Sequence, residues 1–220
     1  MTSAFVLNQP CRVILVGDRY QQIYRFRGAD NALSSPQLAQ ADRLWLTASF
    51  RFGPEVAQMA NILLERAGEE KRVTGNGGQD AVVSSLPAGA EHIAVLSRTV
   101  SGVIGSALTA SLMEKKVFWV GGIEGYKTEE LEDLYWFSAD MPEKMQSPRL
   151  SRDYRNFDEY CSIARATQDV EMNQAIRLLD DFFPIPQKLA IMRRQVVTHE
   201  KDAQVTVSTA HRSKGWNGRW

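Results

Sequence analysis

Aromatic and arginine side chains alternate over one short stretch of the chain, from Tyr24 to Arg27. This Tyr-Arg-Phe-Arg run follows Gln21 and Gln22 and is itself followed by Gly28. Aromatic rings offer faces on which nucleic-acid bases stack, and guanidinium groups bind phosphates. The run therefore indicates a contact with single-stranded nucleic acid. It equally fits an exposed basic turn followed by a core-facing aromatic pair.

The residues before this run predict how it is positioned. Residues 13–16 form an apolar, mostly β-branched run that predicts a strand buried on both faces of a parallel sheet. Gly17 and Asp18 then end the strand. Ligands of open α/β sheets bind beyond the carboxyl ends of the strands. We therefore expect residues 21–28 to lie at a ligand-binding edge.

The segment 16–29, VGDRYQQIYRFRGA, is similar to the third conserved motif of UvrD/Rep-type superfamily 1 DNA helicases, typically VGDxxQSIYxFRGA. Gln22 stands in the usual serine position and is the one departure at the well-defined places. The resemblance implies that Gln21 senses the γ-phosphate of ATP. It also implies that Tyr24 and Phe26 face single-stranded DNA, and that Arg27 holds the segment together or touches DNA.

Ser49-Phe50-Arg51 resembles the fourth motif of the same family, usually NYRS. The resemblance implies that Phe50 stacks on adenine and that Arg51 is an arginine finger on the γ-phosphate. A planar donor that is always charged suits the phosphate charge that develops in the transition state. The alternative for a lone arginine is a surface ion pair. Around this motif we expect a short strand over residues 44–47 and a helix that starts at Pro54 and stops at Gly68.

Two later segments resemble further family motifs. The predicted buried strand 93–96 leads into Arg98 within AVLSRT, where the family places an arginine near the DNA. Residues 205–215, VTVSTAHRSKG, resemble VxLxTxHxxKGLE. By this resemblance Thr209 and His211 contact the DNA backbone, and Gly215 belongs to the nucleotide-binding turn. A lone histidine after a strand is otherwise more often structural. Asn217 replaces the glutamate that usually holds the nucleotide ribose.

The remaining sequence predicts the fold class. Strand and helix patterns alternate over residues 93–120, which fits an α/β fold. Residues 74–80 predict a flexible loop. Three apolar stripes of helical spacing follow within 126–198, the last ending at Pro184 and Pro186. The resemblance implies partial RecA-like P-loop NTPase motor domains with a helical insertion, divided as follows: 1–51, the end of the first RecA-like domain; 52–125, the first part of the second; 126–199, the insertion; and 200–220, the return to the second.

Composition restricts the class of partner only weakly. The 220 residues carry a formal net charge of zero, so a DNA contact must come from a local patch. Cys11 and Cys161 form no disulfide framework, and the three histidines share no metal-ligand spacing, so we expect no metal site in this chain. No apolar stretch suits a membrane span. We expect a cytoplasmic protein, associated with the nucleoid if the source is bacterial.

The predicted function is that of a fragment. A GxxxxGK[ST] P-loop and the acidic magnesium motif are both absent, so the chain alone should not hydrolyse ATP. The intact family member would use ATP and Mg²⁺ as a DNA helicase or translocase on single-stranded DNA in repair or recombination. VFWVGGIEGY, residues 117–126, looks most like the F-box DNA helicase branch and its bacterial relatives. The alternatives are a non-catalytic module that binds nucleic acid or a protein, such as the missing motor half, and a decaying gene piece without a stable fold.

Overall fold

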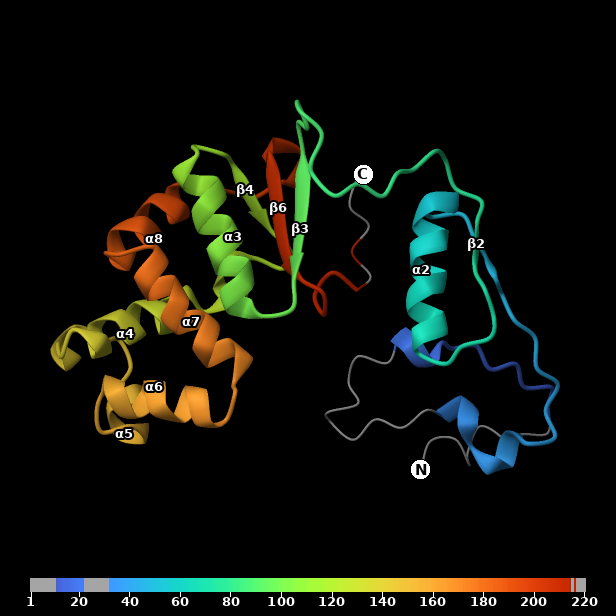
Figure 1. Ribbon diagram of the computed structural model, residues 1–220, viewed down its shortest axis with the longest axis horizontal. Helices are drawn as coiled ribbons and strands as arrows, with labels where there is room; N and C mark the ends of the chain where they lie inside the picture. The colour runs from blue at the N-terminus through green and yellow to red at the C-terminus, as the bar shows by residue number, and fades with distance from the viewer. Residues whose placement is uncertain (1–10, 22–31, 215, 217–220) are drawn as a thin grey trace. The chain divides into compact units, whose positions relative to one another are not determined.

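The computed structural model describes residues 11–21, 32–214 and 216, and the structural statements below concern these residues. The chain divides into two compact units, residues 1–87 and 88–220. Figure 1 follows the chain by colour through both units, and each unit is described here by itself. The four-part domain division expected from the sequence stays a prediction.

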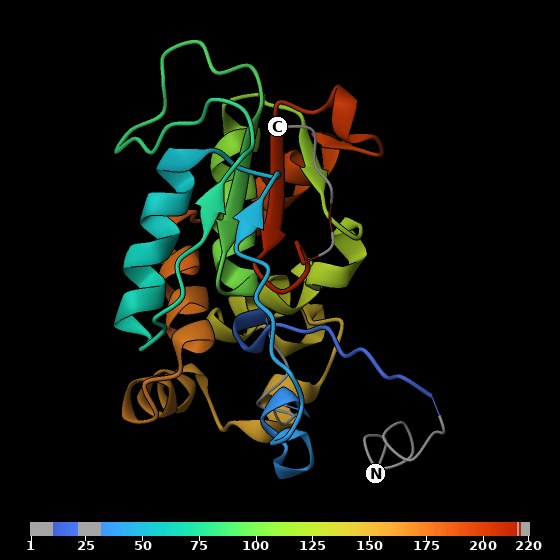
Figure 2. The same ribbon diagram turned by 90° about the vertical axis from the view of Figure 1, so that its right-hand side faces the viewer.

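The first unit is built on a small β-α-β arrangement. Strand β1 (Ala48–Ser49) pairs in parallel with β2 (Thr74–Gly75), and helix α2 (Pro54–Arg66) connects them. The amide of Asn61 joins helix to strand, because it donates to the carbonyl of Val73 (3.0 Å) and accepts from the Val73 amide (2.8 Å). Figure 2 shows the two short strands side by side. Three short 3₁₀ helices complete the described elements of this unit: Arg19–Gln21, Ala32–Ser34 and Pro36–Leu38.

Helix α2 confirms the helix predicted between Pro54 and Gly68. Pro54 occupies the first turn, where its missing N–H costs nothing. The carboxylate of Asp80 accepts hydrogen bonds from the amides of Glu55 (3.0 Å) and Val56 (3.2 Å) and so caps the helix from the following loop. Gly68 has a φ of 78°, the left-handed conformation that ends many helices.

Two strand predictions in this unit are wrong, and a loop prediction is right only in part. Residues 13–16 form no strand, and Ile14 and Val16 are each 81 % exposed. Residues 44–47 form no strand either, because the strand is Ala48–Ser49. The loop predicted over 74–80 is found at residues 76–80, but Thr74–Gly75 form strand β2. A strand exists only where a neighbour completes its hydrogen bonds, and among the described residues of this unit that pairing joins only β1 and β2.

The second unit contains a four-stranded parallel sheet in the order β3-β6-β4-β5. Its strands are β3 (Ile93–Ser97), β4 (Val117–Trp119), β5 (Val196–Val197) and β6 (Val205–Thr209). The strands predicted at 93–96 and 117–120 are confirmed. The expected burial of β3 is wrong, because β3 is an edge strand and Leu96 is 51 % exposed. Every residue of the central strand β6 is buried.

The helices of this unit are α3 (Val100–Leu112), α4 (Thr128–Ser138), α5 (Arg149–Asp153), α6 (Phe157–Ala166), α7 (Val170–Asp181) and α8 (Ile185–Arg194). Helix α3 lies beside the sheet, next to α7 and α8, and α4, α5 and α6 lie further from the sheet (Figure 1). Short 3₁₀ helices occur at Ile123–Tyr126, Pro142–Lys144 and Glu200–Asp202. The helical character predicted for 126–198 is confirmed, although the segment holds five α-helices where three stripes were expected.

A single hydrophobic core joins this sheet to its helices. Val103 and Leu108 of α3, Val117 of β4 and Leu189 of α8 are 0 % exposed. Packing of this kind fixes the positions at which the strands end, and therefore the loops that follow them. The structure is thus a mixed α/β fold with parallel sheets.

Candidate nucleic-acid interface

The carboxyl ends of β3 and β6 bring together two segments that lie far apart in the sequence. The strands run in parallel with Ser97 opposite Thr209, and the amide of Ala210 donates to the carbonyl of Ser97 (2.9 Å). Arg98 follows Ser97 directly, and His211 follows Thr209 after one residue, Ala210. The structure therefore places residues from two of the predicted DNA-binding motifs on adjacent loops at one edge of the sheet.

Arg98 sits at a junction whose backbone is fixed on both sides. Thr99 caps α3 by accepting from the amide of Gly102 (3.0 Å). The carboxylate of Glu171 accepts from the amides of Val100 (3.1 Å) and Ser101 (2.6 Å), so it satisfies two further donors at the start of the helix. The Arg98 side chain itself is exposed. A fixed backbone that carries an exposed guanidinium suits a phosphate contact.

Thr209 supports the turn after β6 rather than projecting from it. It is only 6 % exposed, and its hydroxyl accepts a hydrogen bond from the amide of Arg212 (3.2 Å). The amide of Ser213 donates to the carbonyl of Thr209 (3.0 Å) and closes the same turn. His211 lies on this turn and is exposed. The predicted DNA contact of Thr209 stays a prediction, and in the structure its hydroxyl shapes the turn that presents His211.

A third loop, after β4, completes this edge and includes a contact that the sequence analysis did not predict. The guanidinium of Arg212 lies 4.5 Å above the ring centroid of Tyr126, and its Nη2 donates to the carbonyl of Gly125 (2.5 Å). Tyr126 is 0 % exposed, and its hydroxyl donates to the carbonyl of Val120 (2.9 Å). The one indication in the sequence was a further cation directly after His211.

The charged groups at this edge are mostly cationic. Arg98, Arg212 and Lys214 are exposed together with His211. Of the two carboxylates at this edge, Glu171 is engaged by the start of α3, and Glu124, in the loop after β4, is exposed. Such a local patch on a chain of zero net charge can bind a phosphate backbone without a basic protein surface elsewhere. The loops at this carboxyl edge, 98–99, 120–126 and 210–214, are called the cationic edge below.

The predicted nucleotide-contact residues lie in the first unit. The amide of Gln21 donates to the carboxylate of Asp18 (2.9 Å). Phe50 is 79 % exposed directly after β1, and Arg51 beside it is also exposed. Their roles at ATP stay predictions. The other predicted site residues lie outside the described residues: Tyr24, Phe26, Arg27 and Gly215, together with Asn217.

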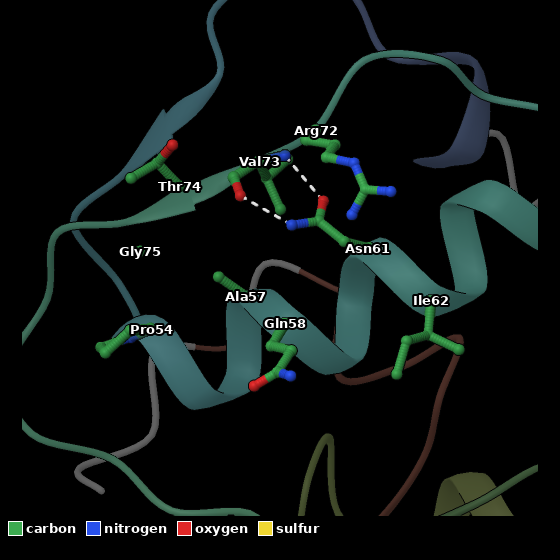
Figure 3. Close-up of a pocket in the computed structure, with 9 residues that line it drawn as sticks. All are labelled: Pro54, Ala57, Gln58, Asn61, Ile62, Arg72, Val73, Thr74 and Gly75. Atoms are coloured by element: carbon green, nitrogen blue, oxygen red, sulfur yellow. Dashed lines mark hydrogen bonds between the residues drawn. The ribbon is translucent and has the colours of Figure 1, made fainter.

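A pocket of about 340 Å³ in the first unit is not this site. It lies between α2 and β2, with residues from Pro54 to Ile62 on one side and from Arg72 to Gly75 on the other (Figure 3). The Asn61 amide that faces it is hydrogen-bonded to Val73. None of the predicted site residues lines this pocket.

The described residues also contain no group of three His, Cys, Asp or Glu side chains that could hold a metal ion. Cys161 is buried, and this burial raises the pKa of its thiol, which makes it a poor nucleophile. In the part of the chain that the structure describes, no helix is both long and apolar enough to cross a membrane.

Together, the parallel sheet and the cationic edge define an α/β protein with exposed cations at the carboxyl edge of its sheet. Comparison with known proteins shows which proteins this chain resembles. The chain is 30 % identical to F-box DNA helicase 1 of Gallus gallus over 222 residues, which cover 96 % of the chain and 22 % of that relative. It is 27 % identical to F-box DNA helicase protein 1 of Schizosaccharomyces pombe over 221 residues, which cover 93 % of the chain and 25 % of that relative.

The chain therefore spans a quarter or less of the length of the curated relatives it matches. Its homologues are DNA helicases by name, which supports a helicase family. No family model matches the chain. No solved structure matches it either.

Proposed function

We propose that this chain is part of an ATP-dependent DNA helicase or translocase of UvrD/Rep type, and that the cationic edge is its contact with single-stranded DNA. The observation that carries the proposal is the placement of Arg98 and His211 on adjacent loops at the carboxyl edge of one parallel sheet. The two residues come from separate segments that each resemble a helicase motif. The alignments with the F-box DNA helicases cover 96 % and 93 % of the chain.

The proposed role of each site residue follows from the chemistry of its side chain. Arg98 supplies a permanent charge and His211 a hydrogen-bonding ring toward the sugar-phosphate backbone, so binding should be independent of base sequence. In the first unit, the exposed ring of Phe50 is available for stacking on adenine, and the exposed Arg51 for a phosphate. ATP with Mg²⁺, when bound by the complete motor, supplies the free energy for domain closure. Gln21 would report the presence of the γ-phosphate.

Fluorescence anisotropy with a labelled oligothymidine tests the DNA contact. We expect weak binding by the wild-type chain, and a dissociation constant raised about three- to tenfold by Arg98→Ala, which corresponds to about 0.6–1.4 kcal/mol. The salt slope should become shallower by about 0.7, because one phosphate contact is lost on a single strand. Arg193→Ala is the matched control, since Arg193 is an exposed arginine of α8 that pairs with Glu132 (2.9 Å).

Equal affinity of Arg98→Ala and wild type, with both proteins folded, would contradict the DNA contact. A wild-type chain that binds no single-stranded DNA would instead favour a module that binds a protein partner. Steady-state ATPase measured with single-stranded DNA and Mg²⁺ should equal the blank for this chain alone. A role in DNA repair or recombination, and a cytoplasmic or nucleoid-associated location, stay predictions.

A further inference from the structure

Arg212 connects two loops of the cationic edge. Its backbone belongs to the turn after β6, where its amide donates to the hydroxyl of Thr209 (3.2 Å). Its side chain reaches the loop after β4, where Nη2 donates to the carbonyl of Gly125 (2.5 Å) and the guanidinium covers the ring of Tyr126. One residue thus ties the turn that carries His211 to a loop of a different strand.

The receiving loop is shaped for this guanidinium. Tyr126 also contacts Trp119 edge-to-face, with ring centroids 4.9 Å apart, and its hydroxyl is hydrogen-bonded to Val120, so its ring is a fixed platform. A Cβ atom added at Gly125 would collide with three guanidinium atoms of Arg212: Nη1, Nη2 and Cζ. At Gly121 such an atom would lie 3.4 Å from Nη1. The distance at Gly121 is an ordinary van der Waals contact, so the absence of a side chain at Gly125 is what leaves the space that the guanidinium occupies.

This contact determines how His211 is presented. His211 directly precedes Arg212, and the turn is closed on its other side by the hydrogen bonds of Thr209. An exposed turn held at one end only would sample several orientations, and ordering them on binding would weaken the complex. Held at both ends, the turn offers His211 in one orientation before any ligand arrives.

We propose that Arg212 is a positioning residue, which clamps the turn after β6 onto Gly125 and Tyr126 and so orients His211 toward a phosphate backbone. The inference rests on the proposed function for its ligand, single-stranded DNA. Arginine is needed because its planar guanidinium stacks on a ring and donates in its own plane at the same time, which the ammonium group of lysine does not do. The competing reading is that Arg212 itself contacts a phosphate.

Two variants separate these readings in the full chain. Arg212→Lys keeps the charge and removes the planar contact. Gly125→Ala keeps Arg212 but displaces its guanidinium, at little cost to the fold, because the displaced atoms are the end of a flexible side chain. The matched controls are Arg193→Lys, which retains its partner Glu132, and Gly78→Ala, where an added Cβ meets nothing within 4 Å.

The first readout needs no DNA. The ring ¹H–¹³C resonances of the three histidines are recorded, and that of His211 is assigned by its loss in His211→Gln. We expect the His211 resonance to shift in Arg212→Lys and in Gly125→Ala, while His92 and His199 and both controls stay unchanged. An unshifted His211 resonance in both variants would overturn the clamp. If the wild-type chain binds no single-stranded DNA, the proposed function fails, and this readout still decides the clamp.

The second readout is affinity for labelled oligothymidine at two salt concentrations. Both variants should weaken binding about five- to tenfold with an unchanged salt slope, because orientation is lost and no phosphate contact is removed. A direct phosphate contact predicts the opposite for Gly125→Ala, since that variant frees the guanidinium while keeping its charge. Wild-type or tighter binding by Gly125→Ala would therefore overturn the positioning role.

Discussion

The two compact units of this chain contain similar apolar segments and bury them very differently. In the second unit, Leu108 and Leu189 are 0 % exposed within a continuous core of sheet and helices. In the first unit, Leu44 and Leu46 are 93 % and 91 % exposed. Among the described residues of that unit, Ala57 is the one apolar side chain that is buried. An apolar run in the sequence therefore does not by itself make a core.

The difference lies in the number of layers that each unit can stack. A sheet face or helix stripe is buried only when a second layer covers it. In the second unit α3 packs on the sheet and also against both α7 and α8. The first unit offers one long helix and a two-residue ladder, which is too little to form a second layer. We infer that the stability of this chain resides in the second unit.

Truncation of one buried and one exposed leucine should show the largest difference in stability between the two units. Leu108→Ala removes a fully buried side chain of α3 and should lower the free energy of unfolding by about 2–5 kcal/mol, the range for cavity-forming changes. Leu63→Ala, in α2, removes a side chain that is 59 % exposed and should change it by less than about 0.5 kcal/mol. Urea denaturation measures both variants when it is followed by tryptophan fluorescence, to which Trp119 of the second unit (1 % exposed) and Trp45 of the first (56 % exposed) both contribute. Equal effects would show that the first unit shares the stability of the second.

Helix caps provide a second comparison of smaller size. Asp169 caps α7 by accepting from the amide of Met172 (2.8 Å), and Asp169→Ala should cost about 1 kcal/mol in the same urea transition. Asp80→Ala removes the cap of α2 in the first unit. It should leave that transition unchanged and speed hydrogen exchange of the Glu55 and Val56 amides. A shifted urea midpoint in Asp80→Ala would contradict the separation of the units.

Elements with local start and stop residues could be predicted from the sequence. Pro54 and Gly68 mark the two ends of α2, and Thr99 caps α3 directly after a strand of the expected type. The absence of a strand over 13–16 could not be foreseen from those residues alone, because strand formation depends on a partner elsewhere in the chain. Helix α8 was missed because Pro186 indicated an end, whereas proline is equally suited to a first helical turn.

The same distinction between local and long-range information applies to the residues of the candidate site. Arg98 and His211 could be named from ordered motifs, since both follow strands whose patterns are local. The role of Arg212 depends on Gly125 and Tyr126, which no spacing rule connects to it. The burial of Thr209 was likewise invisible in the alternating pattern of β6, because a central strand covered on both faces buries its polar residues too.

The smallest expected difference between the units is in their response to alkaline pH, because the groups with shifted pKa values in the two units differ in burial. In the second unit Tyr160 is 7 % exposed and packs edge-to-face on Tyr154, and burial raises its pKa to about 12. In the first unit the shifts belong to Arg19, which is exposed, and to Glu69, which is half-buried. The hydrogen bond to Tyr20 raises the pKa of Arg19, and the backbone hydrogen bond from Lys71 lowers that of the Glu69 carboxyl.

The sign of the Tyr160 effect follows from which state holds the proton. An unfolded tyrosine ionises near pH 10, whereas folded Tyr160 keeps its proton until about pH 12. Its contribution to stability is therefore complete below about pH 10 and is lost as the pH rises toward 12. We expect the urea midpoint to fall between about pH 10 and pH 12, and to fall less in Tyr160→Phe. Tyr20→Phe, at a position 40 % exposed in the first unit, is the matched control and should follow wild type. If Tyr160→Phe keeps the wild-type pH dependence and Tyr20→Phe loses it, the alkaline sensitivity belongs to the first unit and the comparison of the units is wrong.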